Sequence, residues 1–288
     1  MTSPRTLLAA YDLHPKKQFG QNFLSDPSTA EKIAGLSKIT SEDVILELGA
    51  GLGALTIPAA KSAKRLYAIE KDHRLIDILK TELLANRLSN VELIEEDMLK
   101  FDIKNLAENA GQKIIIIGNL PYNISSQIII KLIESRAYVI RAVLMFQKEL
   151  AMRITAQPGG KDYGRLAVML GYCAKIKKLA DVKAHQFFPK PKIDSQILEI
   201  KFLETIKYPA NDEALLFRII KGAFCQRRKT LRNALAGSEL DIDTKTAQNM
   251  LDKAGIDSSL RAEALTISQF VTLSNAFKNL QSSNANMF

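Results

Sequence analysis

The stretch Val44-Ile-Leu-Glu-Leu-Gly49-Ala-Gly51-Leu-Gly53-Ala-Leu-Thr56 decides the fold class of this 288-residue chain. Its first five residues are an apolar run with one acid, which predicts a buried strand. Glycines then occupy alternate positions, and they let the backbone turn sharply and let a ligand approach main-chain atoms. The apolar stretch Leu55–Lys64 predicts a helix. A strand that turns through glycines into a helix is typical of nucleotide-binding α/β sheets, although the same turn can be purely structural.

The strand-helix pattern repeats farther along the chain. Short apolar runs bounded by polar residues predict parallel strands at Leu66–Ile69, Val91–Ile94 and Ile114–Ile117. Amphipathic stretches at Arg74–Asn86 and Leu99–Asn109 predict the helices that connect them. This alternation predicts an α/β fold with a doubly wound, Rossmann-like parallel sheet.

The pattern changes in the last third of the chain. The later elements that we predict are a helix near Ser126–Glu134, a strand near Ala142–Phe146, a helix near Lys148–Ala156, and strands at Leu166–Cys173 and Gln196–Phe202. After Tyr208-Pro209 only helical periodicity remains. We therefore expect a first domain over residues 1–204 and a small all-helical domain over residues 205–288.

Composition excludes several classes of protein. Apolar residues make up 47% of the chain and charged residues 25%, which is typical of a globular protein. The most apolar region, Ile114–Met145, is interrupted by charges before the ~20 apolar residues that a membrane span requires. The first 13 residues lack the apolar run of a signal peptide. We expect a soluble cytoplasmic monomer. The two cysteines and three histidines show no metal-binding spacing, so we expect no metal ion, and Ser195 belongs to no recognisable catalytic triad.

The net charge of +9 is concentrated in two stretches. Residues 141–192 hold eleven basic and three acidic residues, and residues 217–235 hold six basic and no acidic ones. A helical wheel of Phe217–Leu235 predicts one amphipathic helix, whose basic face contains Arg218, Lys221, Arg228, Lys229 and Arg232. Arg227 falls on the apolar side and does not fit. A basic face of this kind favours binding of RNA phosphates, although a merely solvated surface is the alternative.

Acidic residues lie at or near the ends of the first three predicted strands. Glu70 ends the second strand, 17 residues after Gly53, where an acid that accepts hydrogen bonds from ribose hydroxyls is expected. Asp97 follows the third strand and can accept from an adenine amino group. Glu47 precedes the glycines, and a carboxylate there suits the cationic amino acid end of S-adenosylmethionine better than a phosphate of NAD. These positions predict a cofactor site at the carboxyl ends of the strands.

The fourth strand leads into Asn119-Leu120-Pro121-Tyr122. The carboxamide oxygen of Asn119 and a backbone carbonyl near Leu120 or Pro121 can accept the two N–H bonds of an adenine amine. Such acceptors aim the nitrogen lone pair at a sulfonium methyl group. Tyr122 can stack on the base. The alternative interpretation is a simple turn from strand to helix.

Six motifs together resemble those of the ribosomal RNA adenine dimethyltransferase family, and the match is best to its small-subunit branch. These motifs are Gln18-Phe-Gly-Gln-Asn22-Phe-Leu24, the glycine turn, Asn119-Leu-Pro-Tyr122, Tyr163-Gly-Arg-Leu166, Phe187-Phe-Pro-Lys-Pro-Lys-Ile-Asp-Ser195 and Phe224-Cys-Gln-Arg-Arg-Lys-Thr-Leu-Arg-Asn233. They occur in the expected order between about residues 15 and 235. The last fifty residues carry no motif that we can match.

The resemblance implies a function and a set of site residues. The implied contacts to S-adenosylmethionine are Asn22, Leu24, Gly49, Gly51, Glu70, Asp97 and Asn119. The implied target-adenine site is Asn119, Leu120, Pro121 and Tyr122, with Phe187 against the other face of the base. The implied reaction transfers four methyl groups to two adjacent adenines in the 3′-terminal hairpin of 16S rRNA, within an assembling small ribosomal subunit.

Three alternatives stay open at this point. A large-subunit (23S) rRNA methyltransferase of the antibiotic-resistance type shares the motifs of the catalytic half, although the cluster Arg227-Arg-Lys229 and the helical tail favour the small-subunit branch. A non-catalytic assembly factor on the same fold would not need an intact Asn119-Leu-Pro-Tyr122. A nicotinamide-dependent dehydrogenase would need a pyrophosphate-binding loop that we do not find.

Overall fold

The computed structural model describes residues 2–285, except for the side chains of residue 17 and residues 282–285. The chain divides into two compact units. The first contains Met1–Ala151 and Ile176–Phe202, and the second contains Met152–Lys175 and Leu203–Phe288. Our predicted division placed residues 152–175 with the sheet, whereas in the structure they group with the helical residues.

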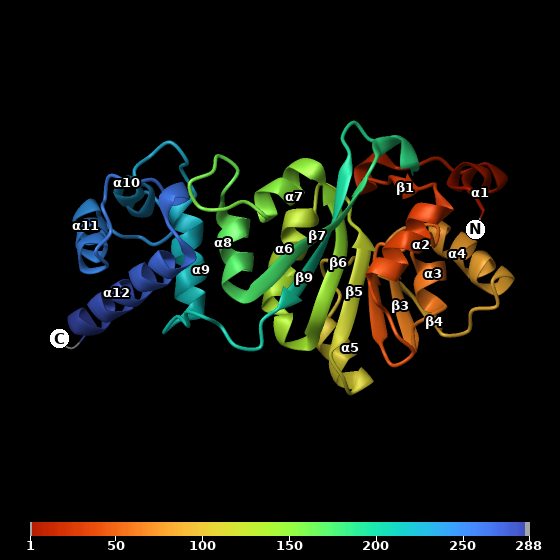
Figure 1. The fold of residues 1–288 in the computed structure, drawn as a ribbon, viewed down its shortest axis with the longest axis horizontal. Helices are drawn as coiled ribbons and strands as arrows, with labels where there is room; N and C mark the ends of the chain where they lie inside the picture. The colour runs from red at the N-terminus through yellow and green to blue at the C-terminus, as the bar shows by residue number, and fades with distance from the viewer. Residues whose placement is uncertain (1, 286–288) are drawn as a thin grey trace. The chain divides into compact units, whose positions relative to one another are not determined.

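A seven-stranded sheet in the order β4-β3-β2-β5-β6-β9-β7 forms the centre of the first unit (Figure 1). Its strands are β2 (Val44–Leu48), β3 (Arg65–Glu70), β4 (Val91–Glu95), β5 (Ile114–Asn119), β6 (Val139–Gln147), β7 (Ala174–Val182) and β9 (Ser195–Phe202). Strands β2 to β6 pair in parallel, and β9 runs antiparallel to β6. The predicted doubly wound α/β class is therefore confirmed.

The order of the strands explains where a ligand can bind. Strands β3 and β4 extend the sheet on one side of β2, whereas β5 and β6 extend it on the other. In open α/β sheets, ligands bind beyond the carboxyl ends of the strands at this reversal of order. Every residue of β2 is buried, and so are the four isoleucines of β5, as expected for central strands covered on both faces.

Five helices begin and end within four residues of their predicted positions, whereas α1 and α2 were not predicted. The helices are α1 (Pro4–Ala10), α2 (Pro27–Leu36), α3 (Thr56–Ala60), α4 (His73–Ala85), α5 (Ile103–Ala110), α6 (Ser125–Glu134) and α7 (Lys148–Ile154), of which α7 extends into the second unit. The side chains of Asp26 and Asp102 cap α2 and α5 by accepting hydrogen bonds from backbone N–H groups. Helix α3 is shorter than the predicted Leu55–Lys64.

A two-stranded sheet joins distant parts of the first unit. Strand β1 (Phe23–Leu24) pairs antiparallel with β8 (Phe187–Phe188). The Ser25 N–H donates to the Gln186 carbonyl at 2.8 Å, and the Gln186 carboxamide donates to Asp26 at 3.0 Å. The sequence did not predict this pairing, because two-residue strands leave no periodic signal.

The second unit is helical over most of its length. Its helices are α8 (Arg165–Cys173), α9 (Glu213–Ala223), α10 (Leu231–Ala236), α11 (Thr244–Lys253) and α12 (Ile267–Ala285). The strand predicted at Leu166–Cys173 is wrong, since this segment is α8. A short apolar run does not distinguish a buried strand from a buried helix.

The single helix predicted at Phe217–Leu235 is also wrong. Helix α9 ends at Ala223, and α10 begins at Leu231 after the extended Thr230. The break turns the chain so that Leu231 and Leu235 become fully buried. Within residues 2–285, no helix is both long and apolar enough to cross a membrane.

Candidate functional site: a pocket at the carboxyl ends of the strands

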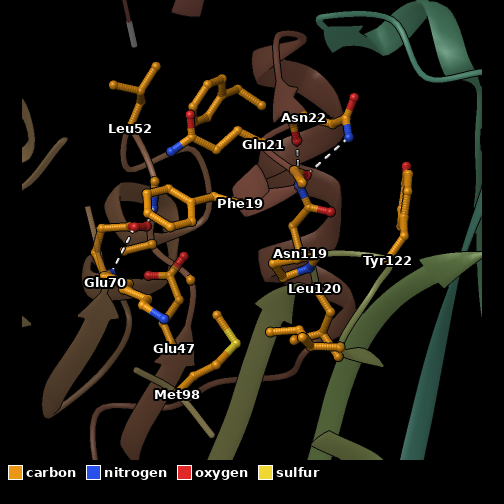
Figure 2. A pocket seen from close by; sticks show the side chains of 18 of the residues that line it. Phe19, Gln21, Asn22, Glu47, Leu52, Glu70, Met98, Asn119, Leu120 and Tyr122 are labelled. Carbon is orange, nitrogen blue, oxygen red and sulfur yellow. Dashed lines mark hydrogen bonds between the residues drawn. The ribbon is translucent and has the colours of Figure 1, made fainter. Parts of the chain in front are cut away.

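The first unit contains an open pocket beyond the carboxyl ends of the parallel strands (Figure 2). Residues from four strand ends line it, within 47–55, 70–71, 97–99 and 119–124. Residues 18–24, which we call the N-terminal segment, line another side. The pocket therefore lies where the reversal of strand order predicts a ligand site.

The glycine turn is held against β3 by its backbone. The N–H groups of Gly49 and Ala50 donate to the Ile69 carbonyl at 3.0 and 2.9 Å. Gly51 has a φ of +55°, a left-handed conformation that favours glycine, and its N–H donates to Glu70 Oε2 at 2.9 Å. A Cβ at Gly51 would lie 3.2 Å from the ring of Phe23. The turn thus needs glycine both for its conformation and for the close approach of the N-terminal segment.

Glu70 is held by its own backbone surroundings. Besides Gly51, the N–H groups of Lys71 and Asp72 donate to Oε1, each at 2.9 Å. Burial raises the pKa of Glu70, and these hydrogen bonds oppose that rise. Three of the roughly four lone-pair sites of the carboxylate are thus used, and Oε2 can still accept from one ribose hydroxyl.

Glu47 is the most deeply buried acid of the pocket. Its exposed fraction is 1%, and Oε2 has no hydrogen-bond partner. Burial, together with the nearby charge of Glu70, raises the pKa of Glu47 to about 7. A buried carboxyl group without a partner is costly unless a cation or donor comes to it. This site therefore fits the ammonium group of an amino acid moiety.

Asp97 also lines the pocket and follows the end of β4. Lys71 Nζ donates to Asp97 Oδ2 at 2.8 Å, and the Leu99 N–H donates to Oδ1 at 3.0 Å. The hydrogen bond from Lys71 is the main reason why the pKa of Asp97 is lowered. Asp97 is thus ionised and fixed in position, with lone pairs left for a further donor.

The side chain of Asn119 has a defined orientation at the end of β5. Its Nδ2 donates to the backbone carbonyl of Asn22 at 2.9 Å (Figure 2). Because a backbone carbonyl only accepts hydrogen bonds, the amide nitrogen must face Asn22, and Oδ1 stays available as an acceptor. The Pro121 carbonyl already accepts from Ser125 Oγ at 2.8 Å and from the Ile124 N–H at 3.3 Å. Of the two carbonyls that the sequence left open, Leu120 is therefore the better acceptor.

Tyr122 is a half-buried aromatic residue at the edge of this pocket. Its hydroxyl lies 3.3 Å from Ser195 Oγ. Burial raises the pKa of Tyr122, so the phenol is neutral near pH 7. A neutral aromatic ring beside Asn119 can provide a stacking surface for a base.

The structure brings most of the predicted first-unit residues together. Those lining the pocket are Asn22, Leu24, Gly49, Gly51, Glu70, Asp97, Asn119, Leu120, Pro121 and Tyr122. Phe187 does not line it. The side chain of Phe187 is only 3% exposed and packs in the hydrophobic core with Leu24, so it has no free face for a base. In this structure Phe187 is a core residue.

The predicted RNA-binding residues do not share one helical face. Arg218 and Lys221 lie on α9, Arg228 and Lys229 lie in the exposed loop before α10, and Arg232 lies on α10. Lys221 Nζ donates to Glu239 at 2.8 Å. Arg227, which did not fit the wheel, donates to the carbonyls of Lys161 at 2.6 Å and Tyr163 at 3.3 Å. Arg227 thus joins two loops of the second unit, and Arg228 and Lys229 remain exposed beside it.

The sequence did not predict a charged network around Asp72, which Gln21 of the N-terminal segment contacts. Asp72, whose side chain is 1% exposed, accepts from Gln21 Nε2 at 3.2 Å and from Arg74 Nη2 at 2.7 Å. Lys16 Nζ lies 3.6 Å from the same carboxylate. Hydrogen bonds from Arg74 are the main reason why the pKa of Asp72 is lowered to about 2. No local pattern reveals such a network, because Lys16 and Gln21 reach Asp72 only in the folded chain.

The sheet order, the glycine turn and the Asn-Leu-Pro-Tyr motif at the end of β5 together define a Rossmann-like methyltransferase. Comparison with known proteins narrows this class. The family model described as ribosomal RNA adenine dimethylase matches residues 13–279. The chain therefore belongs to the ribosomal RNA adenine dimethylase family.

Individual relatives agree with this assignment. Ribosomal RNA small subunit methyltransferase A of Desulforapulum autotrophicum is 53% identical over 283 residues, covering 98% of this chain and 99% of that protein. The crystal structure of a dimethyladenosine transferase from Plasmodium falciparum matches with a TM-score of 0.75 and 28% identity, covering 89% of this chain and 98% of that one. The 23S rRNA methyltransferase ErmE matches with a TM-score of 0.65 and 23% identity, over 89% of this chain and all of that one, and shares the fold.

Proposed function

We propose that this protein transfers methyl groups from S-adenosylmethionine to the N6 atoms of two adjacent adenines in the 3′-terminal hairpin of 16S rRNA, giving N6,N6-dimethyladenine at both. The orientation of the Asn119 carboxamide carries the proposal, because it leaves Oδ1 free to accept from an amine. The relative that is 53% identical is named as a small-subunit methyltransferase, which supports the small-subunit RNA as the substrate.

The pocket fits the proposed cofactor. Glu47, with its unpartnered Oε2, would hold the ammonium group of the amino acid end. Glu70 would accept from a ribose hydroxyl through Oε2, and Asp97 would accept from the adenine amine of the cofactor. Asn22 and Leu24 would cover the cofactor from the N-terminal segment, which lines the same pocket. When bound, the cofactor supplies an electrophilic methyl group on a sulfonium centre.

The residues of β5 and its following turn would present the target adenine. Asn119 Oδ1 and the Leu120 carbonyl would each accept one N–H of the exocyclic amine, which fixes the nitrogen in line with the methyl group. The amine lone pair would form the new N–C bond as the C–S bond breaks, and the electrons of the broken bond would stay on sulfur. The alkylated nitrogen is acidic and loses its proton to water. After the first transfer the amine retains one N–H, and the same site would present it for the second.

Tyr122 would stack on the base and stabilise the positive charge that develops during transfer. Such a cation–π contact contributes about 0.5–2 kcal/mol. A base inside a hairpin must leave its stack to enter the pocket, which costs a few kcal/mol. Cationic residues of the second unit, Arg218, Lys221, Arg228, Lys229 and Arg232, would bind RNA phosphates and help to offset that cost. We further propose that the protein acts in the cytoplasm, as a monomer, on an assembling small-subunit particle.

Transfer of labelled methyl groups tests this function. The protein would be incubated with labelled S-adenosylmethionine and small-subunit particles from cells that lack the endogenous dimethyltransferase. We expect about four methyl groups per particle, and mass spectrometry of the 3′-terminal fragment should find two adjacent dimethyladenines. Particles that already carry both modified adenines serve as the negative control, and 23S rRNA tests the large-subunit alternative. Absence of transfer to the 16S fragment would refute the proposal.

A further inference from the structure

Ser195 is a buried residue to which the sequence alone assigns no chemistry. It begins β9, and its exposed fraction is 0%. Its hydroxyl lies 3.3 Å from the hydroxyl of Tyr122, and either oxygen can be the donor. Because a buried hydroxyl group that loses its partner costs free energy, this hydrogen bond favours one arrangement of the two side chains.

The backbone around Ser195 is fixed without help from the pocket. Ser195 pairs with Gln147 at the end of β6. The preceding residue, Asp194, accepts from the Ala184 N–H at 2.9 Å and from Lys183 Nζ at 3.0 Å, and its carbonyl accepts from the Lys148 N–H at 2.9 Å. Ser195 therefore has a position that the sheet and these contacts determine.

Tyr122 is less constrained. It follows Pro121 in the turn between β5 and α6, and its side chain is half-buried. Figure 2 shows its ring at the edge of the pocket, on the side of Asn119 away from Glu70. A ring in this place can rotate or tilt unless its far end is held. The hydrogen bond to Ser195 holds that end.

We propose that Ser195 is a positioning residue for methyl transfer, which sets the orientation of the Tyr122 ring before the target base enters the pocket. The proposal deepens the proposed function and rests on it. Ser195 does not touch the reacting atoms and acts through Tyr122. An oriented ring lowers the entropy that must be lost when the base stacks, so the contact contributes to the rate of transfer rather than to cofactor binding.

A double-mutant cycle tests this role. Ser195→Ala removes the hydroxyl from one side of the contact, and Tyr122→Phe removes it from the other while keeping the ring. Each single variant should lower kcat by about three- to tenfold, as expected for the loss of one hydrogen bond, with the KM for S-adenosylmethionine unchanged. The double variant should lose no more than either single variant. If the decrease in kcat of the double variant equals the product of the two single decreases, Ser195 acts through something other than Tyr122.

Ser37→Ala is the matched control. Ser37 is also buried, at 1% exposed, and its hydroxyl donates to the Ile33 carbonyl at 2.8 Å, outside the pocket. This variant removes a buried serine hydroxyl from a comparable environment, and kcat should not change. If Ser37→Ala lowers kcat as much as Ser195→Ala does, the effect is one of general stability and the positioning role is refuted.

A spectroscopic readout keeps the test independent of activity. In protein labelled with [13C]tyrosine, the ring resonance that disappears in Tyr122→Phe belongs to Tyr122. This resonance should shift in Ser195→Ala and stay in place in Ser37→Ala. If the wild-type protein transfers no methyl group, the proposed function fails, but this resonance still decides whether Ser195 holds Tyr122. An unchanged resonance in Ser195→Ala would overturn the inference even in an active enzyme.

Discussion

Replacing Glu47 with glutamine should abolish a proton release that accompanies cofactor binding. Glu47 is buried, its Oε2 has no hydrogen-bond partner, and its pKa is raised to about 7. In the free protein it is therefore mostly protonated at pH 6. The proposed cofactor carries an ammonium group, and a cation beside a carboxyl group favours the ionised form. Binding of the cofactor should therefore lower the pKa of Glu47 and expel its proton.

The pKa sets the size of the effect. With a pKa of about 7, Glu47 carries about 0.9 proton at pH 6 and about 0.5 proton at pH 7. The number released should therefore fall as the pH rises through this range. Raising the pH also disfavours the folded free protein relative to the unfolded chain, because a buried carboxyl group with a raised pKa binds its proton more tightly when folded.

Isothermal titration calorimetry measures this release directly. S-adenosylhomocysteine, which carries the same ammonium group, would be titrated at pH 6 in buffers of different ionisation enthalpy. The slope of binding enthalpy against ionisation enthalpy should give about 0.9 proton for the wild-type protein and close to zero for Glu47→Gln. Glu70→Gln tests whether Glu70, whose pKa burial also raises, contributes to the proton release; the variant also removes a charge that raises the pKa of Glu47, so its release should be smaller than that of the wild-type protein but should not vanish. Equal release by wild-type and Glu47→Gln proteins would show that Glu47 does not face the ammonium group.

Three further predictions concern stability and RNA binding. Gly53 has a φ of +85°, and a Cβ at this position would lie 2.5 Å from Leu79 Cδ1, whereas Gly111 has a φ of +67° and no atom within 4 Å of such a Cβ. Gly53→Ala should therefore lower the free energy of unfolding more than Gly111→Ala does. Equal decreases in the two variants would show that the contact with Leu79 does not contribute. Asp72→Asn should lower the free energy of unfolding by about 2 kcal/mol near pH 6. The difference in stability between this variant and the wild-type protein should decrease below about pH 4, because the lowered pKa of Asp72 stabilises the fold only where the carboxyl group is ionised in the unfolded chain. Chemical denaturation measures the free energy of unfolding for both predictions. A difference between wild-type and Asp72→Asn proteins that does not change with pH would contradict the second prediction. Charge reversal at Arg228 and Lys229 should weaken RNA binding. In filter binding, the slope of log K against log salt concentration should decrease in magnitude by about one for each phosphate that is no longer neutralised. An unchanged slope would place the RNA-binding surface elsewhere.

The parallel strands and the pocket residues were largely predictable from the sequence. Buried parallel strands are short apolar runs, and Val44–Leu48 is the strand β2 with the same bounds. Residues at the carboxyl ends of such strands must meet at one edge of the sheet. This rule alone is enough to place Glu70, Asp97 and Asn119 around one pocket.

The parts that were not predictable depend on tertiary packing. The apolar run of α8 satisfies the pattern of a strand equally well. The wheel over Phe217–Leu235 assumed a straight helix, whereas burial of Leu231 and Leu235 requires the chain to turn after Ala223. Phe187 lies in the core because β1 pairs with β8, and no local signal reveals that pairing.

The measurement that tests the central claim most directly compares methyl transfer and RNA binding in Asn119→Ala. The claim is that the Asn119 carboxamide oxygen and the Leu120 carbonyl hold the adenine amine in line with the methyl group. Single-turnover transfer should become undetectable in this variant, while its affinity for the RNA stays close to that of the wild-type protein. Transfer at a rate near that of the wild-type protein would contradict the claim and remove Asn119 from the reaction.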